Sequence, residues 1–246
     1  MFIGAKLIHI PEVDSTNRFA MDLVRNNPPP EGTVIRADFQ NAGRGQQGKQ
    51  WISERGANIN ASVILYPQLL SASEQFLLNM AVALAVCEAA SALCGEPCLL
   101  KWPNDVYHAE RKLAGILIEN SWAGSRWQAA IAGIGLNVNQ QEFAGFPATS
   151  LRNIRGAVLS QEDCLGMLFQ KLEARYLMLR GPRKEQILDD YNQTLMHKNA
   201  TVKLELQDGR VVSATVLGVS RRGGLLIRTA QGEEQEWHHP QVRIIL

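Results

Sequence analysis

The sequence predicts an α+β fold, in which a mixed sheet packs with helices and a small β-barrel follows at the C-terminus. Apolar runs of strand length alternate with helical stretches up to about residue 198. One long stretch, Glu74–Leu93, is apolar on nearly all sides, which predicts a buried central helix. From Ala200 the pattern changes to short β runs separated by glycine turns. We therefore predict a larger domain over residues 1–198 and a small β domain over residues 199–246.

The N-terminal part of the chain predicts a strand, a helix and two further strands. Asp14-Ser15-Thr16-Asn17 offers several N-cap side chains to an amphipathic stretch, and Pro28-Pro29-Pro30 ends that helix. A loop with three glycines, Gln40–Gln50, precedes the third strand. The predicted elements are strands at Lys6–Val13, Thr33–Phe39 and Asn58–Tyr66, and a helix at Arg18–Arg25.

The middle of the chain predicts the central helix, three strands and two further helices. Ser71-Ala72-Ser73-Glu74 has the sequence of a capping box at the start of the central helix. The strand at Trp127–Val138 carries Gly133 and Gly135, where a ligand or a neighbouring backbone can approach closely. The remaining predicted elements are strands at Cys98–Trp102 and Lys112–Glu119 and helices at Ser160–Leu179 and Glu185–Met196.

The last part of the chain has the pattern of a small barrel. Glycine-containing turns, Asp208-Gly209, Arg222-Gly223-Gly224 and Gln231-Gly232, separate its β runs. The predicted strands are Thr201–Leu206, Val211–Val219, Leu225–Thr229 and Gln241–Ile245.

Composition narrows the class of protein. The 246 residues carry 25 Lys and Arg against 24 Asp and Glu, which excludes a strongly basic nucleic-acid binder and an acidic disordered chain. The least charged stretch has 13 residues between Glu74 and Glu88, fewer than the roughly 18–20 that span a bilayer. The N-terminus has no apolar signal segment, so we expect a cytoplasmic protein without a membrane or DNA partner. The four cysteines are expected to be buried reduced thiols.

The glycine loop matches two nucleotide-binding patterns in part. Gly43, Gly45 and Gly48 have the spacing of a dinucleotide fingerprint, and the same segment makes most of a Walker A loop. Both patterns must open a helix, and Walker A needs Ser or Thr where this chain has Gln50. We predict instead that the chain continues into a strand. The loop is then either a flexible connection or a mobile cationic loop that folds over a phosphate-containing ligand.

Five motifs in a fixed order indicate a family. The chain resembles the biotin protein ligases, and the resemblance covers about residues 6–180 with a small β domain after them. It implies a class II synthetase-like catalytic fold of the biotin–lipoate ligase type, followed by an SH3-like barrel. The motifs are Ser15-Thr16-Asn17, Gln40-Asn41-Ala42-Gly43-Arg44-Gly45 with Trp51, Lys101-Trp102-Pro103-Asn104-Asp105, Lys112-Leu113-Ala114-Gly115-Ile116-Leu117-Ile118-Glu119, and Gly133-Ile134-Gly135-Leu136-Asn137-Val138-Asn139.

The resemblance implies that biotin and ATP give biotinyl-AMP and pyrophosphate, and that the biotinyl group passes to a lysine of a carrier domain. The biotin head is a neutral cyclic urea, which a pocket of paired polar groups can discriminate. The implied biotin-binding residues are Ser15, Thr16, Asn17, Gln40, Arg44, Gly45, Gln46, Lys112, Gly115 and Gly135. Helix capping by the first three and a strand bulge at the glycines are the structural alternatives.

Joining a carboxylate to a phosphate brings two anions together, so the site needs cations. The resemblance implies catalytic roles for Lys112, Arg44 and Asp105, the last orienting and helping to deprotonate the acceptor lysine. Solvated surface cations and a turn aspartate are the alternatives. The implied ATP-binding residues are Arg44, Lys49, Trp51, Asn104, Lys112 and Asn137. Mg²⁺ is expected to be held mainly by the phosphates, because the sequence shows no dedicated metal cluster.

The resemblance also implies a partner and leaves alternatives. The partner would be the biotin carboxyl carrier domain of a biotin-dependent carboxylase, and the enzyme would be a monomer or a homodimer. Because the catalytic pattern begins at Lys6, we expect no N-terminal DNA-binding domain. Family loops commonly carry further arginines where this chain has Gln46 and Gln47. The alternatives are a lipoate or octanoate ligase or transferase of the same superfamily, and a non-catalytic ligand-binding module.

Overall fold

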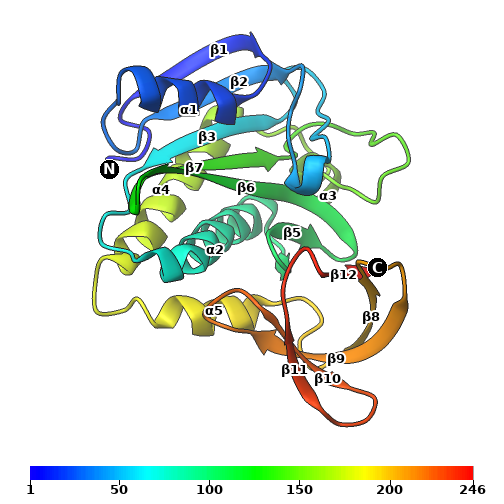
Figure 1. The fold of residues 1–246 in the computed structure, drawn as a ribbon. Helices are drawn as coiled ribbons and strands as arrows, with labels where there is room; N and C mark the ends of the chain where they lie inside the picture. Colours follow the sequence, from blue (N-terminus) through cyan, green and yellow to red (C-terminus); the bar gives the residue numbers. More distant parts are fainter. Residues whose placement is uncertain (246) are drawn as a thin grey trace.

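Two sheets organise the chain in a computed structural model that describes residues 1–245, without the side chain of Gln47. The larger sheet has the strand order β1-β2-β3-β7-β6-β5-β4 (Figure 1). Only β1 and β2 pair in parallel, so the predicted mixed sheet is confirmed. Its strands are β1 Leu7–Val13, β2 Val34–Gln40, β3 Ile59–Leu65, β4 Leu99–Lys101, β5 Asp105–His108, β6 Arg111–Ala123 and β7 Arg126–Leu136.

Helices cover the sheet on both faces. The first helix packs on β2, β3 and β7, whereas the long central helix packs with the second long helix in the main core. The central helix is long and apolar enough to cross a membrane by composition, but two thirds of it lies buried inside this fold. The helices are α1 Thr16–Asn26, α2 Gln75–Cys94, α3 Leu151–Arg155, α4 Gln161–Leu179 and α5 Gln186–Thr194, with single 3₁₀ turns at Gln46–Gly48 and Ala72–Glu74.

Strand β3 shows how the sequence separates the two faces. Ile59, Ala61, Val63 and Leu65 belong to the main core with α2 and α4. Successive side chains of a strand point to opposite faces, so Asn60, Ser62 and Ile64 lie on the side of α1. All seven residues of the strand are buried. The polar members of this strand therefore belong to a buried site and not to the surface.

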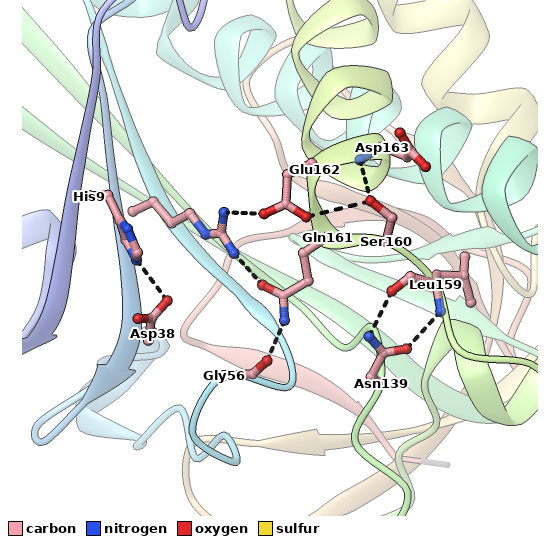
Figure 2. Close-up of polar contacts among 10 residues, drawn as sticks. His9, Asp38, Gly56, Asn139, Leu159, Ser160, Gln161, Glu162 and Asp163 are labelled. Carbon is pink, nitrogen blue, oxygen red and sulfur yellow. Dashed lines mark hydrogen bonds and ion pairs between the residues drawn. The ribbon is translucent and has the colours of Figure 1, made fainter.

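Polar contacts hold the start of α4 against the sheet. Figure 2 shows Gln161 beside the Gly56 carbonyl, to which its side-chain amide donates, and Ser160 capping the helix through the backbone N–H of Asp163. The Arg36 guanidinium of β2 donates to the side chains of Gln161 and Glu162. These contacts fix the turn at Gly56, which precedes β3, against the helical layer.

The C-terminal sheet has five strands in the order β11-β10-β9-β8-β12, and all of its pairs are antiparallel. This agrees with the predicted small β domain. Its strands are β8 Thr201–Leu206, β9 Val211–Val219, β10 Leu225–Thr229, β11 Glu234–Trp237 and β12 Val242–Ile245.

The joint between the two units combines apolar packing, since one core cluster runs through both, with specific polar contacts. The Trp102 indole N–H donates to the Gly223 carbonyl over 2.9 Å, and Asn192 of α5 bonds both backbone groups of Val219. Arg221 lies 2.7 Å from Glu74. The short segment after β4 is therefore held from the side of the C-terminal sheet, which bears on the site described below.

Most predicted elements are confirmed within two residues, including the capping box before α2 and the burial of all four cysteines. Burial raises the pKa of the Cys87 thiol to about 12. The prediction that the glycine loop continues through Trp51 into a strand is confirmed, since no helix follows the loop and β3 begins at Ile59 after a turn at residues 55–57. Three short elements, α3, β5 and β11, were not predicted, since four or five residues carry too little periodicity.

Candidate active site

One cavity of about 880 Å³ opens on the α1 side of the larger sheet. Loops after β2, β4 and β7 surround it, and β12 of the C-terminal sheet closes one side. Every residue that the sequence analysis singled out as a site residue lines this cavity: Ser15, Thr16, Asn17, Gln40, Arg44, Gly45, Gln46, Lys49, Trp51, Asn104, Asp105, Lys112, Gly115, Gly135 and Asn137. Their individual roles stay predictions.

A straight row of paired residues crosses the sheet beneath the cavity. In the register of β3, β7, β6, β5 and β4, Asn60 pairs with Gly135, Gly135 with Gly115, Gly115 with Asp105, and Asp105 with Lys101. Directly paired residues point to the same face of a sheet, and neighbouring strands lie about 4.8 Å apart. The row therefore places a neutral amide at one end, two glycines in the middle and two charged groups at the other end.

The neutral end of the cavity is a network of buried hydroxyls and amides. The Gln40 side-chain carbonyl accepts from the Thr16 backbone N–H at 2.8 Å and from its hydroxyl at 3.1 Å. The Ser62 hydroxyl contacts Thr16 Oγ1 at 2.7 Å and Asn17 Oδ1 at 2.6 Å. Ser15 is the N-cap of α1, as predicted, because its hydroxyl accepts from the third backbone N–H that follows. This network can recognise a compact, uncharged ligand that both donates and accepts hydrogen bonds.

Sequence reasoning missed Ser62, which belongs to this network, and Asn60, which accepts from the Trp51 indole at the neutral end of the row. The signal was present: Asn58, Asn60 and Ser62 stand at every second position of an otherwise apolar strand, hence on one face. All three residues are at most 1% exposed. A buried polar stripe on a strand indicates a site, because unpaired buried polar groups are costly.

The Trp51 indole covers the two glycines of the row. A methyl group at Gly135 would lie 2.3 Å from Trp51 Cε2, and one at Gly115 would lie 3.3 Å from Cζ3. The indole N–H donates to Asn60 Oδ1 at 2.9 Å. Sequence analysis gave the space above these glycines to a ligand, whereas here Trp51 lies in that space. The glycines therefore leave room for a flat ring against the sheet.

Lys112 and Asp105 form an ion pair at the charged end, with Nζ and Oδ1 2.7 Å apart. Lys112 reaches the cavity face because β6 has a bulge: Ala114 pairs with Val106 but Lys112 pairs with Tyr107, so Leu113 is an extra residue. Its Nζ lies 3.2 Å from the position of a methyl group on Gly115. One cation and one carboxylate thus stand directly beside the glycine pair.

The glycine loop folds back on itself as a hairpin-like turn. Gly45 N–H donates to the Lys49 carbonyl at 2.6 Å, and Trp51 N–H donates to the Gly43 carbonyl at 3.0 Å. A single 3₁₀ turn lies between, and no α-helix starts here, which agrees with the rejection of both phosphate-loop patterns. Within the described residues, Arg44 and Lys49 form no ion pair with a carboxylate. The Gln47 side chain, which belongs to the predicted departure from family arginines, lies outside the described part.

Asn104 and Asn137 line the cavity but also hold backbone in place. The Asn104 amide N–H₂ donates to the Ile116 carbonyl, and that of Asn137 donates to the Thr149 carbonyl at 3.0 Å. Each side chain keeps its amide oxygen and a second amide N–H for its predicted nucleotide contact. Sequence reasoning assigned no role to Lys101 of the third motif. It also missed lining residues that only the fold brings here, namely Tyr107, Phe143, Phe146, His239, Arg243 and Ile244.

Residues 10–137 match the model of the biotin/lipoate A/B protein ligase family. Among curated proteins, the bifunctional ligase/repressor BirA of Bacillus spizizenii is 32% identical over 239 residues, which is 94% of this chain and 71% of that protein. The biotin–[acetyl-CoA-carboxylase] ligase of Mycobacterium tuberculosis is 30% identical over 222 residues, or 89% of this chain and 81% of that protein. The matched region contains every residue of the row described above.

A solved structure agrees over nearly the whole chain. The biotin protein ligase from Aquifex aeolicus in complex with biotin and ATP aligns with a TM-score of 0.83 and 27% identity, covering 98% of this chain and 99% of that one. The similarity therefore extends through the C-terminal sheet as well as the larger one.

Proposed function

Because the chain belongs to the biotin/lipoate A/B protein ligase family, we propose that it activates biotin with ATP and transfers the biotinyl group to a lysine of a carrier protein. ATP-dependent ligation of biotin to protein is the activity that the named relatives and the Aquifex complex support. The observation that carries the proposal is the order of groups on one face of the sheet. A neutral polar network comes first, a flat apolar stretch at the glycines second, and the Lys112–Asp105 pair third.

This order matches the chemical order of biotin. The ureido ring carries one carbonyl and two N–H groups, which suit the network of Thr16, Gln40 and Ser62. The apolar part of the molecule would lie along the glycines and Trp51. Its carboxylate would then reach Lys112, since the two strand spacings from Asn60 to Gly115 span about 10 Å.

In the first step, a biotin carboxylate oxygen attacks the α-phosphorus of ATP and pyrophosphate leaves. Both reacting groups are anionic, so cations at their meeting point stabilise the transition state. Lys112 and Arg44 supply that charge, with Lys49, Trp51, Asn104 and Asn137 as the proposed nucleotide contacts. The Lys112 ammonium is paired with Asp105 in the absence of substrates. When the substrates bind, the biotin carboxylate and the α-phosphate compete with Asp105 for this ammonium.

In the second step, the neutral amine of the acceptor lysine attacks the carbonyl carbon of biotinyl-AMP. A C–N bond forms, the C–O bond to AMP breaks, and AMP leaves with the electron pair. The nitrogen loses a proton, which Asp105 accepts once Lys112 is engaged elsewhere. Asp105 lies one strand away from the glycine pair and therefore one strand beyond the predicted biotin tail.

The metal and the partners are proposals from the same chemistry. The described residues contain no group of three or more His, Cys, Asp or Glu side chains that could hold a metal ion. Mg²⁺ would therefore enter with the nucleotide, held mainly by phosphate oxygens, and no step here depends on it. The carrier would be the biotin carboxyl carrier domain of a carboxylase, which the name of the mycobacterial relative suggests.

The division into domains, the oligomeric state and the location in the cell are also proposals. Residues 1–198 would act as the catalytic domain and residues 199–246 as the small β domain that closes one side of the cavity. A cytoplasmic monomer or homodimer without a DNA or membrane partner is the proposed state.

The test is ATP–pyrophosphate exchange with biotin and, separately, with lipoate, followed by transfer of labelled biotin to a purified carrier domain. We expect exchange only with biotin and transfer only with ATP. Ser62→Ala should raise the biotin concentration that exchange requires, whereas Ser121→Ala, towards the end of β6 and outside the cavity lining, should not. Exchange with lipoate in place of biotin would redirect the assignment, and failure with both would refute it.

A further inference from the structure

Lys101 is a cation in the cavity wall for which the proposed reaction has no role. It is the last residue of β4 and pairs directly with Asp105, so their Cβ atoms are expected about 5 Å apart. Its Nζ lies 5.3 Å from the centre of the Tyr107 ring. Among the described residues no carboxylate lies within ion-pair distance of Lys101, whereas Lys112 has Asp105. Burying an ammonium group without a counter-ion destabilises the fold, so a half-buried unpaired lysine indicates a functional role.

Three cations and one carboxylate surround Lys101. Its pKa lies below the ordinary value because of burial first; Asp105, the largest single charge effect, raises it, whereas Lys112, Lys49 and Arg243 lower it. The lowered pKa of Lys101 indicates how this environment would shift the pKa of a second lysine amine that entered it. Partial burial and neighbouring cations both disfavour the protonated form of such an amine.

Two histidines and two carboxylates complete the charged groups of this region. The pKa of His197 is lowered by burial and then by Lys101, while Glu110 acts in the opposite direction. The pKa of His239 is lowered by burial and then by Lys49. Glu205 is already paired with Arg243. Neither histidine offsets the positive potential around Lys101, and the one carboxylate beside it is Asp105.

The acceptor lysine must lose a proton before it can attack. A free lysine has a pKa of about 10.4, so only about one molecule in a few thousand is neutral at pH 7. A nearby cation lowers that pKa, and enzymes that use a reactive lysine exploit this effect. Asp105 alone would do the reverse, because a carboxylate favours the ammonium form. The site therefore needs a cation next to its base.

We propose that Lys101 lowers the pKa of the incoming acceptor lysine, so that the amine reaches Asp105 and the adenylate in its neutral form. This inference rests on the proposed function and adds to it a residue that acts in the transfer step alone. Lys112 cannot serve this purpose freely, because the biotin carboxylate and the α-phosphate engage it. Lys101 stands one strand further from the glycines than Asp105, on the side where Arg243 of β12 lies.

The separation between Lys101 and the acceptor amine determines the expected size of the pKa change. Removing a unit charge about 6 Å from an amine changes the pKa of that amine by roughly 0.5–2 units, depending on the effective dielectric constant. Lys101→Met keeps the apolar stem over the Tyr107 ring and removes only the charge. We expect the apparent pKa of the transfer step to rise by about one unit and the rate near pH 7 to fall about tenfold.

The experiment measures single-turnover transfer from purified biotinyl-AMP to a carboxyl carrier domain, between pH 6 and pH 10. Wild type is compared with Lys101→Met, Lys101→Arg and Lys171→Met, the last removing a charge from α4 on the other face of the sheet. Lys101→Met should converge with wild type at high pH, and Lys101→Arg should restore the wild-type profile because it restores the charge. Biotin-dependent pyrophosphate exchange is measured on the same variants and should be unchanged.

Other outcomes overturn the inference. A rate that falls equally at every pH would give Lys101 a structural role, and a fall in exchange ahead of transfer would make it a nucleotide contact. An arginine variant as slow as the methionine variant would show that the charge is not what matters. Failure of wild type to exchange or transfer at all would instead refute the proposed function, so the two failures are distinguishable.

Discussion

Replacing Lys112 by methionine tests the charged end of the row most directly. Its ammonium lies 2.7 Å from Asp105, with the two side chains 32% and 24% exposed. An ion pair with this exposure contributes about 0.2–1 kcal/mol to stability. For a domain of this size that corresponds to a fall in Tm of at most about 4 °C. Methionine retains the apolar stem, so the fold should survive.

The effect on the chemistry should be far larger than the effect on folding. Removing one group that stabilises developing charge costs about 2.7–4 kcal/mol of transition-state stabilisation, or roughly 100 to 1,000-fold in rate. Biotin-dependent ATP–pyrophosphate exchange measures this step without the carrier. We therefore expect a loss of at least 100-fold in exchange together with a small change in Tm.

A matched ion pair elsewhere in the chain supplies the control. Lys184 lies 2.7 Å from Glu74, with side chains 28% and 14% exposed, and neither residue lines the cavity. Lys184→Met should lower Tm about as much as Lys112→Met and leave exchange intact. Exchange at the wild-type rate in Lys112→Met, or an equal loss in both variants, would refute the assignment of Lys112 to the reaction.

Three further predictions follow from the same geometry. Asp105→Asn should slow transfer to the carrier more than pyrophosphate exchange, and an equal loss in both assays would make Asp105 a structural or nucleotide-binding residue. Gly133→Ala places a methyl group 2.4 Å from Asn17 Oδ1, so the affinity for biotin measured by calorimetry should fall, and unchanged affinity would remove that amide from the biotin site. The Glu74 pKa is lowered from 4.5 to about 2, chiefly by the hydrogen bond from Lys184. Its folded pKa lies below its unfolded pKa, so its contribution to stability is present above about pH 4.5 and is lost as the pH falls towards 2; Glu74→Gln should flatten acid unfolding in that window.

The sequence predicted the long elements because their signals are local. The helix α2 is apolar all round and follows a capping box, and both hydrogen bonds of that box are present. Strands β9 and β10 were predicted residue for residue, because glycine turns delimit them. Strand β11, Glu234–Trp237, consists of polar residues and one tryptophan, so nothing in its composition distinguishes it from a loop. Its pairing with β10 alone defines it.

The membership of the site was predicted from ordered motifs, but its geometry could not be. Arg243 and Ile244 line the cavity although they lie more than 100 residues beyond Asn137, and no local pattern connects them with it. The Trp102 indole donates to the Gly223 carbonyl and holds the C-terminal sheet, a contact that no local motif indicates. Contacts between distant segments depend on how the two units dock, which composition and periodicity do not encode.

The position of Lys112 shows this limit in a single strand. Strict alternation from Gly115 would put residue 113 on the cavity face and residue 112 on the core face. The bulge at Leu113 instead lets Leu113 and Ala114 both enter the main core and turns Lys112 towards the cavity. A bulge depends on the partner strand, here β5, which is only four residues long and was not predicted. The proposed catalytic cation therefore reaches the row through an irregularity that only the pairing of β5 and β6 creates. A change in β5 that restored regular pairing would turn Lys112 towards the core and away from the proposed substrates, although the motifs in the sequence would remain intact.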